Sequence, residues 1–239
     1  TALAFSFDGK ILAALDETGK GMTYTIPTGT RLTEFTGHDN AVFSAVFSPS
    51  NTGNYIIASG GGNDNEIILW NPINGLTIRK IKGKGSPIYQ LAFGDAYELF
   101  ISKEMVNNDK PLFKSSFDFS TFVVNRNPTR TPSLSQNPKD IFQTGINSIA
   151  LPKGKAIETD ESIDGRILDF RTLPDGGVVV ASDFSLKLFD KNGNLNKEFM
   201  GHSGAIRTVT VSEDGKYLAS GGEDQSVIIW KLSETGFAP

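Results

Sequence analysis

The chain has 239 residues, of which 38% are hydrophobic and 21% charged, so it can form one large domain or two small ones and is too apolar for a disordered protein. Its net charge of −4 gives no general electrostatic attraction to nucleic acid or to an anionic membrane surface. The absence of cysteine excludes disulfides, thiolate zinc sites and cysteine nucleophiles, and no run reaches the roughly 18 apolar residues that cross a bilayer.

From the first residue onward, short β-branched and aromatic runs alternate with Gly and Pro, which predicts many short strands joined by tight turns. The sequence starts at Thr1 without a methionine and opens within an apolar strand, so we expect a piece of a longer protein. Hairpin turns are predicted at five dipeptides in which Gly accepts a positive φ at little cost: Asp8-Gly9, Asn74-Gly75, Asp175-Gly176, Asn192-Gly193 and Asp214-Gly215.

One apolar strand recurs about every 40 residues, a period typical of a four-stranded β-propeller blade. It is marked by Phe7, Phe47, Phe93, Phe170 and Val209. We predict a single domain of six units, at residues 1–36, 37–82, 83–110, 111–161, 162–200 and 201–239. The last unit stops after its third strand, so its outer strand is expected from upstream of Thr1.

Residues 104–147 break the rhythm with Pro, Ser and Asn. This stretch is either a degenerate blade, with strands in residues 113–124, or a long insertion; the gap from Phe93 to Phe170, about two periods, favours the blade. Its cations could form a weak docking surface for anions, but nearby acidic residues favour an ordinary solvated loop. These cations are Lys110, Lys114, Arg126, Arg130 and Lys139.

Residues 201–230, "GHSGAIRTVTVSEDGKYLASGGEDQSVIIW", resemble the WD-repeat (WD40) signature, and residues 37–75 form a second, similar copy. The resemblance implies an all-β propeller of four-stranded antiparallel blades, which we expect to be part of a seven-bladed ring. It also implies a buried hydrogen-bonded tetrad in each copy. The tetrads would be His202, Ser220, Asp224 and Trp230 in one copy, and His38, Ser59, Asp64 and Trp70 in the other.

A structural role for these tetrads is favoured over chemistry. A Ser-His-Asp set can serve a hydrolase, but the chain lacks a Gly-x-Ser-x-Gly elbow, and both sets lie inside repeats. Residues 63–66 could offer oxygen ligands to calcium, although a solvated turn is favoured, and the glycines at 60–62 and 83–85 lack the phosphate-loop pattern. We predict no catalytic residue, cofactor or metal.

Aromatic residues recur at strand spacing, and we expect them in the core rather than in a stacking platform for bases. They are Phe43, Phe47, Phe93, Phe117, Phe119 and Phe170.

The resemblance implies a non-catalytic scaffold that binds protein or peptide partners, with no nucleic acid or membrane. The expected contact surface is a loop rim, comprising residues 38–40, 83–87, 162–166 and 202–205 and the turns at 60–65 and 221–225. The alternatives are a regulatory propeller of a larger multidomain enzyme, such as a fused bacterial protease or kinase, and a propeller enzyme with a site in its channel. The compartment is not specified by the sequence, with the cytoplasm favoured.

Overall fold

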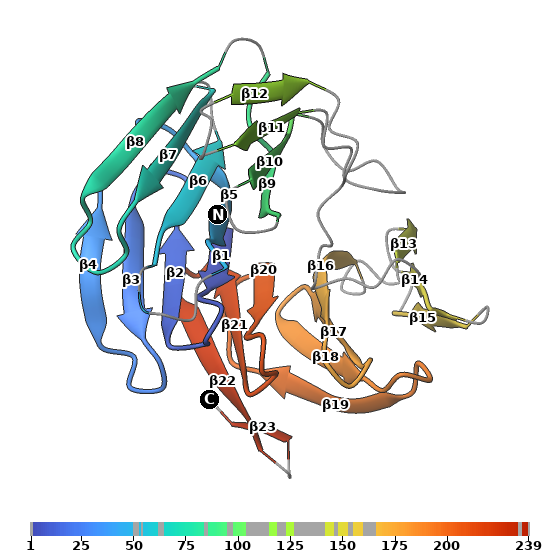
Figure 1. The fold of residues 1–239 in the computed structure, drawn as a ribbon. Helices are drawn as coiled ribbons and strands as arrows, with labels where there is room; N and C mark the ends of the chain where they lie inside the picture. Colours follow the sequence, from blue (N-terminus) through green and yellow to red (C-terminus); the bar gives the residue numbers. More distant parts are fainter. Residues whose placement is uncertain are drawn as a thin grey trace. The chain divides into compact units, whose positions relative to one another are not determined.

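The computed structural model contains β-strands and no α-helix within the residues that it describes, so the predicted all-β class is confirmed (Figure 1). No helix of these residues could span a membrane. The described residues are 2–49, 53, 55–61, 65–83, 86–94, 98–103, 115–118, 123–126, 142–145, 148–152, 155–159, 166–233 and 236–238.

The chain divides into two compact units, and the first, Thr1–Ser133, contains three four-stranded antiparallel sheets. The first sheet holds β1 (Ala2–Phe5), β2 (Ile11–Leu15), β3 (Gly21–Thr25) and β4 (Arg31–Phe35). The second holds β5 (Val42–Phe47), β6 (Ile57–Gly61), β7 (Glu66–Trp70) and β8 (Thr77–Lys82). The third holds β9 (Gln90–Phe93), β10 (Glu98–Ser102), β11 (Ser115–Asp118) and β12 (Val123–Arg126). In each sheet the strands lie side by side in chain order, as the four-stranded blade predicts.

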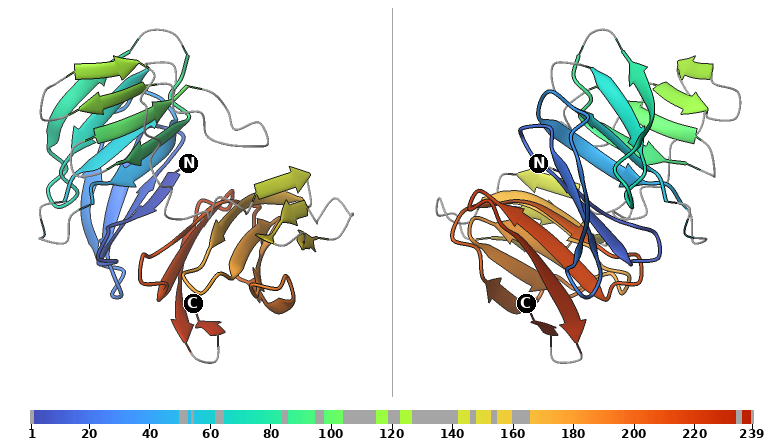
Figure 2. Two further views of the ribbon diagram at one scale, coloured as in Figure 1. Left: turned by 45° about the vertical axis from the view of Figure 1, so that its right-hand side comes forward. Right: turned by 90° about the vertical axis from the view of Figure 1, so that its left-hand side faces the viewer.

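The second unit, Leu134–Pro239, contains one three-stranded and two four-stranded antiparallel sheets, again in chain order (Figure 2). The small sheet holds β13 (Phe142–Gly145), β14 (Ser148–Ala150) and β15 (Ala156–Glu158). The next holds β16 (Ile167–Thr172), β17 (Val178–Ser182), β18 (Ser185–Phe189) and β19 (Leu195–Met200). The last holds β20 (Ile206–Val211), β21 (Tyr217–Gly222), β22 (Val227–Ser233) and β23 (Gly236–Ala238).

One unit boundary and the outer strand of the last unit differ from the sequence prediction. Strands β11 and β12 complete the third sheet, so that sheet extends to Arg126, and the irregular stretch is shared between two sheets instead of forming one blade or one insertion. In the last sheet β23 pairs with β22 from Ser233↔Gly236 to Lys231↔Ala238, so the chain supplies its own fourth strand. A strand of three residues is too short to leave a periodic signal in the sequence. The single-domain arrangement and the seven-bladed ring stay predictions.

The predicted hairpin glycines are confirmed by their backbone conformation. Gly9, Gly75, Gly176, Gly193 and Gly215 all have φ between 68° and 87°, a region that side chains disfavour. Each of them lies between two paired strands, so the short turns follow from local backbone chemistry.

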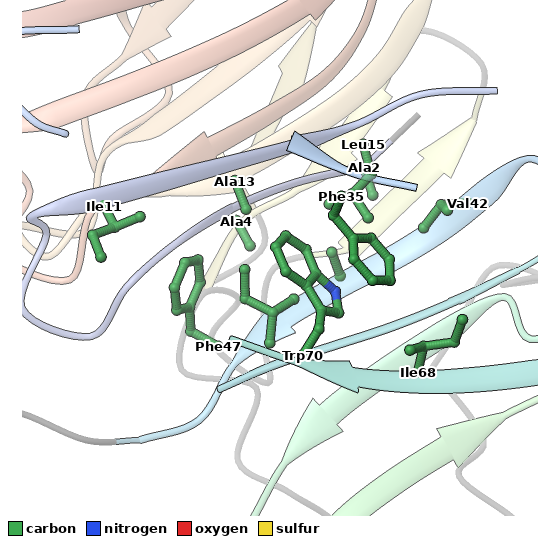
Figure 3. Close-up of a cluster of buried hydrophobic side chains, with 12 residues drawn as sticks. Ala2, Ala4, Ile11, Ala13, Leu15, Phe35, Val42, Phe47, Ile68 and Trp70 are labelled. Atoms are coloured by element: carbon green, nitrogen blue, oxygen red, sulfur yellow. The ribbon is translucent and has the colours of Figure 1, made fainter. Parts of the chain in front are cut away.

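Buried apolar side chains fill the space between successive sheets within each unit. Between the first and second sheets, Phe35 of β4 stacks on Trp70 of β7, with ring centroids 4.3 Å apart and planes 2° from parallel (Figure 3). Strands β6, β7 and β17 are buried along their whole length, because neighbouring sheets cover both of their faces. Sheet-to-sheet packing is therefore the main source of stability within each unit.

The expectation that all the recurring aromatics are core residues is wrong for Phe43. Phe47 is buried and Phe93 and Phe170 are half-buried against apolar clusters, but Phe43 is 41% exposed. The register of β5 and β6 shifts between Val42↔Gly61 and Ser44↔Gly60, so Phe43 is the extra residue of a β-bulge and leaves the alternation of the strand. The side chain of Phe117 and all of Phe119 lie outside the described residues.

Replacing Phe35 tests the packing between the first two sheets. We expect Phe35→Ala to lower the free energy of unfolding by about 3–5 kcal/mol, because it removes a fully buried ring and leaves a cavity beside Trp70. The measurement is a urea titration followed by tryptophan fluorescence. Phe7→Ala, at a Phe that is 48% exposed, is the matched control and should change stability little; equal losses in both variants would contradict the packing argument.

Candidate functional site

A polar network occupies the last sheet, and each of its members comes from a different element. Ser220 lies in β21 and Trp230 in β22, two residues beyond the position that pairs with Ser220. His202 lies in the connection from β19 to β20, and Asp224 lies in the turn from β21 to β22. The structure therefore brings together four residues that are separated by up to 28 positions in the chain.

The hydroxyl of Ser220 is the centre of this network. The indole Nε1 of Trp230 donates to Ser220 Oγ at 2.9 Å, and His202 Nε2 lies 2.8 Å from the same oxygen. His202 Nδ1 lies 3.0 Å from a carboxylate oxygen of Asp224, which only accepts when ionised, so Nδ1 carries the proton. Nε2 of the neutral ring then accepts from the hydroxyl of Ser220, and every donor in the series from Trp230 to Asp224 has an acceptor.

The second sheet repeats the arrangement. His38 Nε2 lies 2.8 Å from Ser59 Oγ, and Trp70 Nε1 donates to the same oxygen at 3.0 Å. His38 is 7% exposed, and Ser59 and Trp70 are completely buried. Asp64, the expected fourth member, lies outside the described residues.

Close packing explains the glycine that precedes each histidine. A Cβ on Gly37 would lie 2.1 Å from a ring carbon of Phe35, and a Cβ on Gly201 would lie 2.9 Å from Cη2 of Trp230. Neither position has room for a side chain, because the backbone passes directly over the buried ring. In the last sheet the glycine thus packs on the tryptophan of the network itself, and in the second sheet it packs on Phe35, which stacks on the network's Trp70.

Hydrogen bonds hold Asp224 in its ionised form. Burial by itself raises the pKa of this carboxyl, but the bonds from the Ser226 hydroxyl, the Ser203 amide and His202 outweigh it, and the pKa lies well below its usual range. The Ser203 amide donates at 2.8 Å and the Ser226 hydroxyl at 2.7 Å. The sequence analysis did not predict the role of Ser226. The corresponding residue of the second sheet is Glu66, so the position does not stand out when the two copies are compared.

These networks leave no reactive group open to a substrate. Ser59 and Ser220 are both 0% exposed, and each hydroxyl is occupied by its histidine and tryptophan partners. Among the described residues, no cluster of His, Asp and Glu could hold a metal ion. The arrangement is suited to holding strands and loops together.

Inner strands of neighbouring sheets are also joined by side chains that the sequence analysis missed. Ser44 Oγ in β5 accepts from the amide of Leu91 in β9 at 2.9 Å. Asp169 Oδ2 in β16 accepts from the amide of Val209 in β20 at 2.9 Å. Both Ser44 and Asp169 directly follow a bulge in their strand, so one position performs the same task in both units.

The bulges turn other side chains outward at the start of the inner strands. Phe43 stacks on Tyr89, which immediately precedes β9, with centroids 5.5 Å apart and planes 8° from parallel. At the bulge of β20, Arg207 forms an ion pair with Glu223, and both side chains are 51% exposed. The starts of β5 and β20 therefore present exposed groups beside the predicted loop rim.

The weaker sequence candidates are only partly described. Of the possible calcium ligands at 63–66, Glu66 pairs with Lys82 at 2.9 Å, and the hydrogen bond from Lys82 is the main cause that lowers the pKa of Glu66. Asn63 lies outside the described residues. So do the side chain of Arg126 and all of Lys110, Lys114, Arg130 and Lys139, together with rim residues 62–64, 84–85 and 162–165.

Comparison with known proteins agrees with this architecture of repeated four-stranded sheets. The pattern of the family "WD domain, G-beta repeat" matches residues 29–71 and 193–231, the two segments that contain the histidine networks. These two segments of the chain are therefore WD repeats by sequence, in agreement with the resemblance noted above.

Individual relatives match over short stretches of their own length. MST50-interacting protein 11 of Pyricularia oryzae is 38% identical over 69 residues, which are 28% of this chain and 22% of that protein. Nuclear distribution protein PAC1-1 of Uncinocarpus reesii is 39% identical over 56 residues, 23% of this chain and 13% of the relative. The 66 kDa stress protein of Physarum polycephalum is 22% identical over 201 residues, 81% of this chain and 32% of the relative. The chain thus spans less than a third of each of these proteins.

Removing the shared hydroxyl tests the network. We expect Ser220→Ala to lower the free energy of unfolding by about 2–5 kcal/mol, because Trp230 Nε1 and His202 Nε2 both lose their buried partner. Chemical denaturation followed by fluorescence provides the measurement. Ser203→Ala removes the same atoms from an exposed residue that contributes only its amide to the network, and it should be nearly neutral. A neutral Ser220→Ala would contradict the central role of this hydroxyl.

The lowered pKa of Asp224 predicts how stability depends on pH. A carboxyl whose folded-state pKa is below the unfolded value of about 3.9 contributes its full stability above that value and loses it as the pH falls through the folded-state pKa. We therefore expect Asp224→Asn to be less stable at pH 7 and to lose less further stability than the wild type between about pH 5 and pH 2. Urea titrations across this range measure the difference; parallel curves for the two proteins would refute the assignment.

Proposed function

We propose that this chain is a non-catalytic protein-interaction scaffold that binds protein or peptide partners through its loop rim. The observation that carries the proposal is the contrast between the buried histidine networks and the exposed side chains near the expected rim. The described members of the histidine networks are hydrogen-bonded to one another and largely buried, whereas exposed groups lie at the starts of β5 and β20, beside the expected rim.

The stacked pair Phe43 and Tyr89 is the strongest candidate for a contact in the first unit. Phe43 is 41% exposed and stacks on the half-buried Tyr89, so the pair presents a rigid apolar surface with few rotatable bonds, which suits a buried anchor at a protein interface. The names of two relatives support the same class of function, since one is an MST50-interacting protein and another, RACK1 of Neurospora crassa, is a small ribosomal subunit protein.

The second candidate function is a regulatory part of a larger multidomain protein. It is favoured by the fact that the relatives extend well beyond the matched stretch, by more than two thirds of their length in the three proteins compared above. In this case partner binding and an activity encoded elsewhere would occur in the same protein.

A quantitative pull-down tests the proposal. We expect the wild-type chain to retain one or more proteins from a lysate of its own organism, and the double variant Phe43→Ser with Tyr89→Ser to retain at least tenfold less of them, because it lacks the aromatic anchor. Quantitative mass spectrometry of the retained proteins gives the measurement.

Phe7→Ser is the matched control, since it removes an exposed Phe from the turn between β1 and β2, at the opposite end of an inner strand from the rim. It should leave retention unchanged. The proposal fails if the double variant retains every protein that the wild type retains, or if nothing is retained and the purified chain turns over a substrate.

A further inference from the structure

The segment from the turn before β8 to the end of that strand combines exposed apolar and cationic side chains. Ile73, Leu76 and Ile78 are 46%, 65% and 53% exposed, and they account for three of the nine large hydrophobic residues exposed in the described part of the chain. They occupy only six consecutive positions, so the exposed apolar surface is concentrated here.

Corresponding positions of other sheets show that the fold does not require this apolar character. In three sheets a backbone carbonyl accepts the hydrogen bond that closes the turn before the outer strand. This carbonyl belongs to Leu76 in the second sheet, to Thr30 in the first and to Asn194 in the fifth sheet, which holds β16 to β19. The extra residue of the following bulge is Ile78 here and Asn196 in the fifth sheet.

In the first sheet the bulge residue is apolar, Leu32, but it is half-buried and packs against the core. Of these three sheets, only the second therefore places apolar residues in solvent at both positions.

Positive charge follows the apolar segment along β8. The exposed residues Arg79, Lys80 and Lys82 lie there, and the acid that pairs with both lysines is Glu66, at 3.8 Å and 2.9 Å. The side chains of Lys80 and Lys82 remain 44% and 77% exposed despite these pairs. The strand thus runs from an apolar start to a cationic end.

The backbone of β8 adds a third feature. It is the last strand of its sheet, paired with β7 on one side and with no strand of the described residues on the other (Figure 1). Alternate N–H and C=O groups of such an edge strand point away from the sheet and can pair with another extended chain.

We propose that β8 is a docking site for an extended segment of a partner protein, which adds to the sheet as an antiparallel strand. The segment carries acidic residues opposite Lys80 and Lys82, followed by apolar residues opposite Ile78 and Leu76. Backbone pairing supplies the geometry, while charge and apolar burial select the sequence.

A second copy of this chain is a poor occupant of the same edge. Antiparallel pairing of two β8 strands centred on Arg79 would place this residue opposite Arg79 of the other copy. The pairing would also bring together Lys80 and Lys82 of both copies, four lysines in all, without supplying any acidic residue. Like charges opposite each other are unfavourable, and lysines on an edge strand discourage such self-association. The cations therefore exclude identical copies and favour an acidic partner.

A fluorescein-labelled peptide of about 12 residues with the core Glu-Thr-Glu-Thr-Val-Thr-Leu tests the site by fluorescence anisotropy with the full chain. We expect saturable binding that weakens at least tenfold in the double variant Leu76→Asn with Ile78→Asn. Leu195→Asn removes a comparably exposed leucine, 53%, from the outer strand of the fifth sheet and should leave the affinity unchanged.

The backbone component is tested with the wild-type chain, so it does not depend on the folding of any variant. A peptide N-methylated at alternate residues should lose binding, because its amides can no longer donate to the edge of β8. The proposal is overturned if the unmodified peptide shows no saturation at about 1 mM, if N-methylation has no effect, or if the double variant binds as the wild type does. The end of β8 leads into rim residues 83–87, but the rim proposal is tested at Phe43 and Tyr89 and the edge proposal at Leu76 and Ile78, at the other end of the strand. Any of these results therefore leaves the test of the rim proposal unaffected, and the variant at Phe43 and Tyr89 should bind the peptide normally.

Discussion

Each of the two best-formed repeats depends on one buried serine hydroxyl. In the last sheet, Ser220 accepts a hydrogen bond from Trp230 and donates to His202, which in turn is held by Asp224. The hydroxyl thereby links two neighbouring strands to the loop that leads into the inner strand. Since an unpaired buried polar group is costly, the network specifies one arrangement of these elements and disfavours others.

This constraint separates the residues that maintain the fold from those available for recognition. Both histidines, both tryptophans, Ser59 and Ser220 are engaged in buried hydrogen bonds, and the glycine before each histidine is needed for close packing against an aromatic ring. Three of the exposed groups discussed above lie where a strand departs from regular alternation. Phe43 and Arg207 occupy bulges of inner strands, and Ile78 occupies a bulge of an outer strand.

A bulge therefore has two consequences in this fold. It turns one side chain out of the alternating pattern, and it positions the following residue to link neighbouring sheets, as Ser44 and Asp169 do. The two consequences are complementary, because the link keeps the inner strands in place while the bulged residue faces solvent. The exposed Phe43 at the start of β5 thus precedes a residue that is anchored to the neighbouring inner strand.

The sequence by itself determined the repeated strands, the turns at the Asp-Gly and Asn-Gly pairs and the two WD-repeat segments, and it predicted the residues of the last network. Each of these follows from local periodicity or from a motif of fixed spacing. Only the tertiary structure decided that Phe43 and Ile78 are exposed to solvent and that the Ser226 hydroxyl donates a hydrogen bond to Asp224. It also decided that β11, β12 and β23 complete their sheets. The physical reason is that a bulge shifts the register by one residue and reverses which side chain faces the core. Very short strands form because an adjacent strand pairs with them. Neither effect leaves a period in the chain that could be read without knowing which strand lies opposite.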